Sequence, residues 1–588
     1  MGFELGRYDR RFPLVIDPVL AFSTYLGGPY EDQPGGIAVG PDGSVTIAGW
    51  DGLDAVLTRI DAAGALVWSA RLGGSDFEAG QDVAVDGQGN VYVTGSTFSA
   101  DFPVVGGVQG VRKGPGDAFV AKLAPDGRSL LFSTFLGGSG IERGNGIGVD
   151  ATGAVTVAGF TLSADFPVTP GAPQMMLGGG ADAFVAKLSP SGSALIYATY
   201  LGGAENDGYS FDQSNVLAVD AAGNAWVTGP TRSLDFPTTA SALRRSYAGG
   251  DFDAFVARFS PDGSLSWSTY LGGGGYDSAY GIAAAPDGSV FIAGVTLSPD
   301  FPVTPGAFDT VPAPCCFSDG FLARLDSSGS RLLLGTFLGG SQGVGAYDVA
   351  LSSGGYLYIT GKTNSTDLPL VDPVQSSCSS CGSSGYADAF AMVLDPSGSR
   401  AVFSTYLGGL DEDRGNAVAV DAPGSLWVAG EAGRGFPVTP GALQTLYGGG
   451  TSDGFLVKVA FATTQFILDV NGYFTSDGSF FTLTPCRVVD TRRSPGPGRG
   501  PALIAGGDRT FRVTGNCGVP TGALALAANL AVTAPTSQGH LRLFPSGSPS
   551  PLVSSLNYSA GQTRSNNAIV PLGPDGSVIV RCVQLPPP

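Results

Sequence analysis

The tripeptide Leu-Gly-Gly recurs along this chain, and seven copies at nearly regular spacing each mark one structural unit. These copies begin at Leu26, Leu72, Leu136, Leu201, Leu271, Leu338 and Leu407, and an eighth copy at Leu177 falls outside the spacing. A second phrase occurs once in each unit and reads Asp-Ala-Phe-Val-Ala-Lys-Leu in its clearest form. Its copies begin at Asp54, Asp117, Asp182, Asp253, Asp319, Asp388 and Asp453. Self-similarity with a period of roughly 45–70 residues indicates an array of repeated supersecondary units.

One unit contains four short strands. Runs rich in β-branched residues at 147–149 and 155–158 flank Asp150-Ala151-Thr152-Gly153, which has the composition of a tight turn. A long polar insertion follows, and then two more runs at 183–188 and 194–201. Helical periodicity is absent. Four antiparallel strands repeated seven times predict an all-β fold, a seven-bladed β-propeller, whose radial sheets leave only short edges.

The two ends of the array predict how the ring closes. The run 21–26 before the first Leu-Gly-Gly is a fourth strand with no preceding partners, and the last unit has a third strand at 455–459 but no fourth. The N-terminal strand is therefore predicted to complete the last blade. We assign 1–19 to an N-terminal segment, 20–461 to the propeller and 462–588 to a separate C-terminal domain.

The repeated phrases resemble a known family. Ser23-Thr24-Tyr25-Leu26-Gly27-Gly28 and Asp165-Phe166-Pro167-Val168-Thr169-Pro170-Gly171 are similar to repeats of the bacterial seven-bladed β-propeller repeat family, and the resemblance covers about three quarters of the chain. That family implies secreted or cell-surface proteins of multidomain architecture. It implies no single activity, because one fold supports many functions.

The sequences at the two ends of the chain differ from the repeats. Pro485-Cys486-Arg487-Val488 and Cys517-Gly518-Val519-Pro520 resemble a β-sandwich-like module at the ends of bacterial exported proteins. Residues 1–19 contain no signal-peptide core, so the export signal is not in this chain and we interpret the segment as the remnant of a longer upstream region.

Composition limits the partners. The net charge is −19 with a sequence pI of about 4.4, and an acidic surface repels nucleic acid and anionic membranes. No run of 18 apolar residues is present, so no membrane-spanning segment is predicted. Extracellular glycans, proteins and cations remain as partners.

Histidine is nearly absent. The single histidine is His540, in the C-terminal domain, which excludes Ser-His-Asp and Cys-His mechanisms in the repeats. We expect His540 to be a surface or turn residue. Carboxylates are numerous enough for an acid/base pair. The seven repeated Asp residues, however, are expected to hold backbone N–H groups where a strand begins.

Binding is predicted on one face of the ring. The long insertions and the loops between units share that face, which we call the long-loop face. Its acidic loops make it a candidate polyol or calcium site. The first unit lacks the insertion, which predicts a notch beside Trp50, an aromatic platform for sugars. The candidate ligand-binding residues are Trp50, Asp32, Asp76, Glu78, Glu142, Asp207, Asp277 and Asp413.

The cysteines predict disulfides, the default for an exported protein. Cys315 and Cys316 lie in one insertion and Cys378 and Cys381 in the next, so we expect two disulfides there or, less favoured, a Cys₄ zinc site. The Cys378-x-x-Cys381 spacing can close within a turn. Cys486 and Cys517 are further candidates.

These features favour a non-enzymatic scaffold, exported or attached to the cell surface, that binds an extracellular glycan or protein through its long-loop face. One alternative is a carboxylate-dependent carbohydrate-active hydrolase or lyase on the same face. Another is a structural subunit of a surface layer or filament. The residue types point to no catalytic residue and no certain cofactor.

Overall fold

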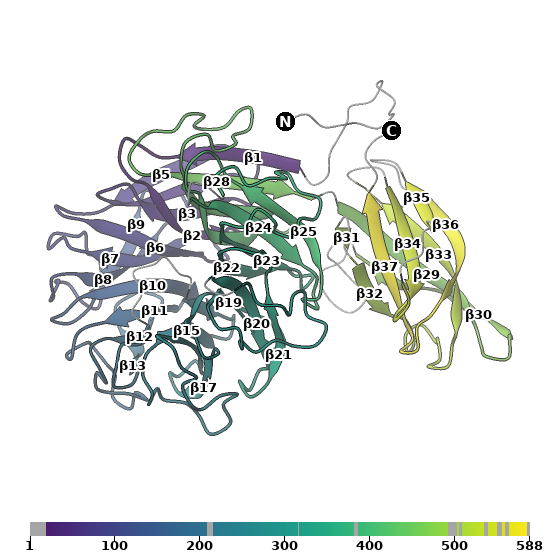
Figure 1. The fold of residues 1–588 in the computed structure, drawn as a ribbon, viewed down its shortest axis with the longest axis horizontal. Coiled ribbons are helices and arrows are strands. Elements are labelled where there is room, and N and C mark those ends of the chain that lie inside the picture. The colour runs from purple at the N-terminus through teal and green to yellow at the C-terminus, as the bar shows by residue number, and fades with distance from the viewer. Residues whose placement is uncertain are drawn as a thin grey trace.

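The described part of the chain is built from strands and turns. The computed structural model describes residues 19–208, 216–314, 317–381, 386–461, 463–491, 503–504, 508–533, 535, 539–549, 555–558 and 564–584 (Figure 1). These residues contain no helix, so none of them forms a helix of membrane-spanning length and hydropathy. The predicted all-β fold is confirmed for them.

Residues 19–461 form antiparallel sheets of four strands each. Four sheets follow one another in chain order: β2(Gln33–Val39) β3(Val45–Trp50) β4(Ala55–Ile60) β5(Leu66–Leu72); β6(Glu78–Val85) β7(Val91–Thr97) β8(Asp117–Leu123) β9(Leu130–Leu136); β10(Glu142–Val149) β11(Val155–Thr161) β12(Asp182–Leu188) β13(Leu195–Leu201); β14(Leu217–Val219) β15(Ala225–Thr231) β16(Asp253–Phe259) β17(Leu265–Leu271). Three more complete the array: β18(Asp277–Ala284) β19(Val290–Thr296) β20(Asp319–Leu325) β21(Leu332–Phe337); β22(Val344–Leu351) β23(Leu357–Thr363) β24(Asp388–Leu394) β25(Ala401–Leu407); β26(Arg414–Val420) β27(Leu426–Ala432) β28(Asp453–Ala460) with β1(Val19–Leu26).

The sheets are arranged around a common centre. The first strand of each sheet contacts the first strand of the next, from β2 and β6 through to β22 and β26, and β26 in turn contacts β2. Apolar residues from adjacent sheets pack between them. Leu57 and Leu72 of one sheet, for example, share a buried cluster with Phe119 and Phe135 of the following sheet. Burial on both sheet faces explains the nearly continuous apolar runs along the second and third strands.

The N-terminal strand belongs to the last sheet. β1 pairs antiparallel with β28, with Ser23 opposite Val457 and Tyr25 opposite Phe455, and Figure 1 shows purple β1 beside green β28. The predicted pairing of these two chain-distant strands is therefore present. It holds the two ends of the array together without leaving β28 as an edge.

Residues 463–584 form two further sheets. β29(Thr463–Phe474), β30(Phe480–Asp490), β33(Ala525–Thr533) and β36(Arg564–Pro571) form one, with β31(Leu503–Ile504) paired to β29; β32(Asp508–Arg512), β34(Gly539–Pro545), β35(Leu556–Tyr558) and β37(Ser577–Gln584) form the other. Leu468 and Leu530 of the first sheet share one buried core with Leu541 and Val580 of the second. Tyr356 donates a hydrogen bond of 3.1 Å to the Asp508 carbonyl and so links this region to the repeats.

The expectation for His540 was wrong. His540 is the second residue of β34 and only 8% exposed, and its Nε2 accepts a hydrogen bond of 3.1 Å from Arg542. Burial and the Arg542 charge lower the pKa of the imidazole. Its neighbours Gly539 and Leu541 are buried as well, so β34 is covered on both faces at this position.

Tyr25 tests the importance of the β1–β28 pairing. Its side chain is 2% exposed, and its hydroxyl donates to the Gly433 carbonyl at 2.9 Å and accepts from the Phe436 N–H at 2.8 Å. Tyr25→Ala is expected to lower the free energy of unfolding by about 3–5 kcal/mol, and Tyr25→Phe by about 1–2 kcal/mol. Urea unfolding would measure both. Tyr30→Ala, at an exposed residue, is the control, and a Tyr25→Ala protein as stable as that control would contradict the role of β1.

Candidate functional site

Six of the seven sheets carry a long insertion that packs along the outer strand of the same sheet. In the β6–β9 sheet this insertion is 98–116. Val105 and Ser133 exchange backbone hydrogen bonds of 3.2 and 2.9 Å, and the Phe135 N–H donates to the Gln109 carbonyl at 3.2 Å. The corresponding bonds of 3.0 and 3.2 Å join Thr169 to Ala198 and Tyr200 to Gln174 in the next sheet. The insertion thus covers the outer edge of its sheet.

An aromatic residue of the insertion fills the space between neighbouring sheets. Phe166 is 3% exposed, and its ring centroid lies 4.6 Å from that of Phe184. The Tyr200 hydroxyl accepts from the Phe166 N–H at 3.1 Å and donates to the Ser163 carbonyl at 2.8 Å. The Asp-Phe-Pro phrase is therefore an apolar wedge anchored by the aromatic residue of the outer strand.

The aspartate of the phrase binds the preceding sheet. Asp165 accepts the Ser139 N–H at 2.8 Å, where Ser139 directly follows a Leu-Gly-Gly turn. The same bond, of 2.8 to 2.9 Å, joins four other insertions to the preceding loop: Ser75 to Asp101, Ala204 to Asp235, Gly274 to Asp300 and Ser341 to Asp367.

The β2–β5 sheet has neither the insertion nor the residues that would hold one. Only 51–54 separate β3 from β4. By position along the strands, Val56 and Arg71 stand where the next sheet has Phe119 and Phe135, and Ala70 stands where it has Thr134. Pro29, which follows the preceding Leu-Gly-Gly, has no N–H to donate.

The missing insertion leaves a cleft of about 560 Å³ between the last sheet and the first. The last sheet contributes Tyr25 to Tyr30 and Leu443, and the first contributes Ile47, Trp50 and Val56. Trp50 is partly exposed and its ring meets Phe77 edge-on at 5.2 Å, while Tyr30 is 69% exposed. The cleft coincides with the predicted notch, and Trp50 lines it.

One wall of the cleft is a free strand edge. Among the described residues β5 pairs only with β4, whereas the other outer strands also bond an insertion. Ser69 and Arg71 correspond to Ser133 and Phe135, whose backbone groups bond the insertion of the next sheet. The Arg71 side chain is 66% exposed, forms a salt bridge with Asp51 and lies 3.6 Å from Asp54. Apolar surface, aromatic rings and unpaired backbone groups therefore meet in one place.

Comparison with known proteins identifies the repeats. Two segments, 67–103 and 266–302, match the family model described as Beta-propeller repeat, and each runs from the outer strand of one sheet through the Asp-Phe-Pro phrase of the next. These two segments are similar to the β-propeller repeat. The comparison with curated proteins gave no match.

Solved structures resemble the propeller region at low identity. BamB from Moraxella catarrhalis is 13% identical, with 76% of this chain and 100% of that chain covered and a TM-score of 0.30. A protein of unknown function from Dyadobacter fermentans is 10% identical, with 76% and 100% covered and a TM-score of 0.37. YCF48 bound to D1 peptide is 10% identical, with 76% and 99% covered and a TM-score of 0.35. Such TM-scores are too low to indicate what this chain binds.

Most of the acidic candidates lie inside the propeller. Asp32, Glu78, Glu142, Asp207, Asp277 and Asp413 are at most 7% exposed, and each follows a Leu-Gly-Gly by four residues. Each carboxylate accepts the N–H of the second glycine at 2.7–2.9 Å, as Glu142 does from Gly138. Asp76 alone is exposed. Of the acidic candidates, only Asp32 lines the cleft, so the structure does not gather the set into one cation site.

Six of the seven repeated aspartates hold backbone N–H groups, as predicted, and the carboxylate of the seventh, Asp54, lies 3.6 Å from Arg71 instead. Asp117 accepts from the Lys113 and Gly114 N–H groups, both at 3.0 Å, and Asp453 accepts from Gly448 at 2.6 Å. All of them except Asp319, where Val344 occupies the acid position, stand close to an acid of the group described above. The first glycine of the turn lies between them: a Cβ on Gly202 would be 2.6 Å from Asp182 Cγ and 2.8 Å from Asp207 Oδ2. The propeller therefore contains buried carboxyl pairs.

Burial shifts the titration of these pairs. It raises the pKa of Asp182 to about 6, of Asp253 to about 7 and of Asp413 to about 8, and the neighbouring carboxylates Asp207, Asp277 and Asp388 add to the shift. Burial likewise raises the pKa of Asp32 to about 6, with a smaller contribution from Asp453. A carboxyl that is protonated near neutrality can donate to its neighbour instead of repelling it.

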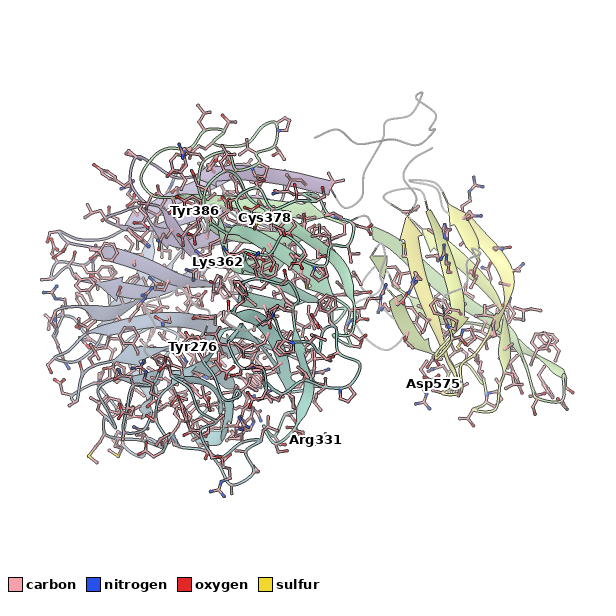
Figure 2. The ribbon with its side chains drawn as sticks, in the orientation of Figure 1. Tyr276, Arg331, Lys362, Cys378, Tyr386 and Asp575 are labelled. Atoms are coloured by element: carbon pink, nitrogen blue, oxygen red, sulfur yellow. A yellow bond between two sulfur atoms is a disulfide. The ribbon has the colours of Figure 1, made fainter. Side chains whose placement is uncertain are left out.

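Two of the predicted disulfides are present. Cys378 and Cys381, in the insertion between β23 and β24, are bonded with a Cα–Cα distance of 5.5 Å, and Cys486 and Cys517 with 5.8 Å. Figure 2 labels Cys378 together with Lys362 of β23. Cys315 and Cys316 lie outside the described residues. Cys378, Cys381 and Asp388 have ligand atoms within 4.8 Å of one another, but the disulfide occupies both sulfur atoms.

The sequence pattern located Trp50 and Asp32 but not the rest of the cleft. Tyr30, Arg71 and the free edge of β5 were not proposed. The sequence does contain a signal for this free edge. The other outer strands have Thr followed by an aromatic residue at the positions that Ala70 and Arg71 occupy in 66–72.

The carboxyl pairs predict that acid stabilises this propeller. In the folded state these aspartates have raised pKa values, so between pH 5 and 8 the folded state binds more protons than the unfolded state, and stability falls as pH rises. The melting temperature is expected to be about 5 °C higher at pH 5.5 than at pH 8. Asp413→Asn should reduce this difference and Asp76→Asn, at an exposed position, should not. A melting temperature that rises with pH over this range would contradict the prediction.

Proposed function

We propose that residues 20–461 form one closed seven-bladed β-propeller, that 462–588 form a β-sandwich-like domain, and that the protein is exported or attached to the cell surface. The seven four-stranded sheets, the β1–β28 pairing and the contact between β26 and β2 support the closed ring. The shared core of the two C-terminal sheets supports the sandwich. The resemblance to bacterial exported families supports the location.

We further propose that this propeller is a non-enzymatic binding scaffold and that its ligand is an extended polypeptide segment of an extracellular protein. The observation that carries the proposal is the free outer edge of β5 beside the cleft of about 560 Å³. An exposed strand edge offers main-chain hydrogen bonds to an added strand, and side-chain pockets beside it give selectivity. In the neighbouring sheets that position is filled by polypeptide.

A glycan is the second candidate ligand. Trp50 and Tyr30 both line the cleft, and partly exposed aromatic rings can stack on sugar faces. We favour polypeptide because a glycan would leave the backbone groups of Ser69 and Arg71 to water. The cleft acids support binding over hydrolysis, since Asp32 holds the Gly28 N–H at 2.7 Å and Asp51 pairs with Arg71.

Selection from a random peptide library on the immobilised full chain would test the proposal, with a glycan array as the second arm. Selected peptides should bind Trp50→Ala and Ser69→Pro proteins at least about tenfold more weakly, because the first removes a wall of the cleft and the second blocks the strand edge. Leu131→Ala, at an exposed position on the covered β9 strand, is the control. Glycans bound in a Trp50-dependent way without any selected peptide would replace polypeptide by glycan. Ligands insensitive to both cleft variants would overturn the site.

A further inference from the structure

A row of polar side chains crosses the sheet of β30, β29, β33 and β36 in the C-terminal region. Arg487 of β30 is paired with Asp469 of β29, and Asp469 is paired with Asn529 of β33. Asn529 in turn is paired with Asn567 of β36, so every strand of the sheet contributes one residue to the row. Leu530, the residue after Asn529, belongs to the buried core. Because side chains alternate along a strand, the row lies on the opposite, outer face of the sheet.

The outer face is hollowed at this row. A hollow of about 430 Å³ is lined by Asp469, Asn471, Pro485, Arg487 and Asn529. Its volume is within the range of about 300–1,000 Å³ that is common for small-molecule sites. The pairing of β29 shifts by one residue at Asn471 on both of its sides. Such a bulge redirects a side chain, and here it adds a second amide to the hollow.

The polar groups of the hollow can bond a ligand. Arg487 Nε and Nη2 donate to Asp469 Oδ1 and Oδ2 at 2.8 and 3.1 Å, so these two charges compensate each other in a fixed geometry. Each carboxylate oxygen retains a lone pair that can accept a further hydrogen bond. Among the described residues, the side-chain amides of Asn471 and Asn529 have no hydrogen-bond partner. The hollow therefore offers donors and acceptors side by side with no net charge.

An aromatic ring borders the hollow. Phe480 is 47% exposed, and its ring lies over Gly472, the residue that follows Asn471. A Cβ on Gly472 would be 2.6 Å from Phe480 Cε2, so the missing side chain leaves room for the ring. Phe474 packs against the same ring, with the centroids 4.8 Å apart. A partly exposed ring that is held beside polar groups can stack on the apolar face of a sugar.

We infer that this hollow is a second binding site of the protein and that its ligand is a neutral glycan. Neighbouring strands are about 4.8 Å apart, so the carboxylate and the two amides can reach several hydroxyl groups of one sugar residue. An ionic ligand gains little, because the charges of Arg487 and Asp469 already compensate each other. A polypeptide cannot add as a strand at β29 or β33, since each already pairs with a strand on both sides.

A glycan array that carries neutral and acidic glycans tests the inference on the full chain. Binding is measured on the Trp50→Ala protein, in which the cleft beside β5 is impaired. This protein should bind neutral glycans. Adding Asn529→Ala should weaken that binding at least about tenfold, because an amide that bonds the hydroxyl groups is lost. Adding Phe480→Ala should weaken it about fivefold, because the stacking ring is lost.

Asn557→Ala, at an exposed amide of β35 in the other sheet, is the matched control and should leave glycan binding unchanged. The Asn529→Ala and Asn557→Ala proteins should have the same melting temperature, so that a loss of binding is not a loss of fold. Glycan binding that is equal in these two proteins overturns the inference. Binding of acidic glycans alone, or of no glycan, also overturns it.

The peptide selection described above separates this site from the proposed function. Peptides that bind the cleft should bind the Asn529→Ala protein as tightly as the natural chain, and neutral glycans should still bind the Ser69→Pro protein. Glycan binding that depends on Asn529, without any selected peptide, supports this site and overturns the polypeptide ligand of the cleft. Peptide binding at the cleft, without glycan binding that depends on Asn529, supports the proposed function and overturns the inference.

Discussion

The hydrogen bonds that join each sheet to the next are the interaction on which this propeller depends. The acid that follows each Leu-Gly-Gly by four residues bonds in two directions. The Glu142 carboxylate holds the Gly138 N–H at 2.9 Å, and the Glu142 backbone N–H donates at 3.0 Å to the Gly116 carbonyl of the preceding sheet. The first strand of the next sheet is thereby connected to the turn after the fourth strand and to the start of the third strand of the preceding sheet. A ring of sheets needs such a junction at every step, which explains why the Leu-Gly-Gly phrase repeats so regularly.

The one junction that lacks this acid shows how the carboxylate affects the turn. At the fifth junction Val344 occupies the acid position, and its N–H still donates to the Ser318 carbonyl at 2.9 Å. There is no carboxylate to hold the turn, and Gly339 and Gly340 have φ values of 80° and 108°. Among the Leu-Gly-Gly turns only this one has glycines at positive φ. The carboxylate thus selects one backbone geometry of the turn, and glycine allows the alternative where the carboxylate is missing.

The sequence predicted the strands and their order because turns and alternating apolar runs are local signals. It also predicted the β1–β28 partnership, since an unmatched strand at each end of a repeat array has one obvious partner. It placed the acids on the surface incorrectly for a physical reason: a polar loop residue is covered only when the next sheet packs over it, and that contact is not local. The strict spacing of Glu78 and Asp277 from their glycines was the available clue, because binding sites rarely repeat in every unit.

The missing insertion was predicted, but the free edge of β5 was harder to foresee, because it is recognised only when Pro29 and Arg71 are considered together. Pro29 alone and Arg71 alone are unremarkable surface residues. Their effect becomes clear only by comparison with the other sheets, where an N–H donor and an aromatic ring at the same positions hold the insertion.

The cleft also keeps its shape without an insertion. The Asn416 amide donates to the Pro34 carbonyl at 2.9 Å near the centre, the Asp32 N–H donates to the Ser452 carbonyl at 3.0 Å, and Lys458 donates to the Ala62 carbonyl at 2.9 Å on the opposite face. The two sheets are thus fixed at three levels around an open space. A segment entering a space that is already formed loses little free energy to rearrangement of its host, so modest contacts along β5 suffice for binding.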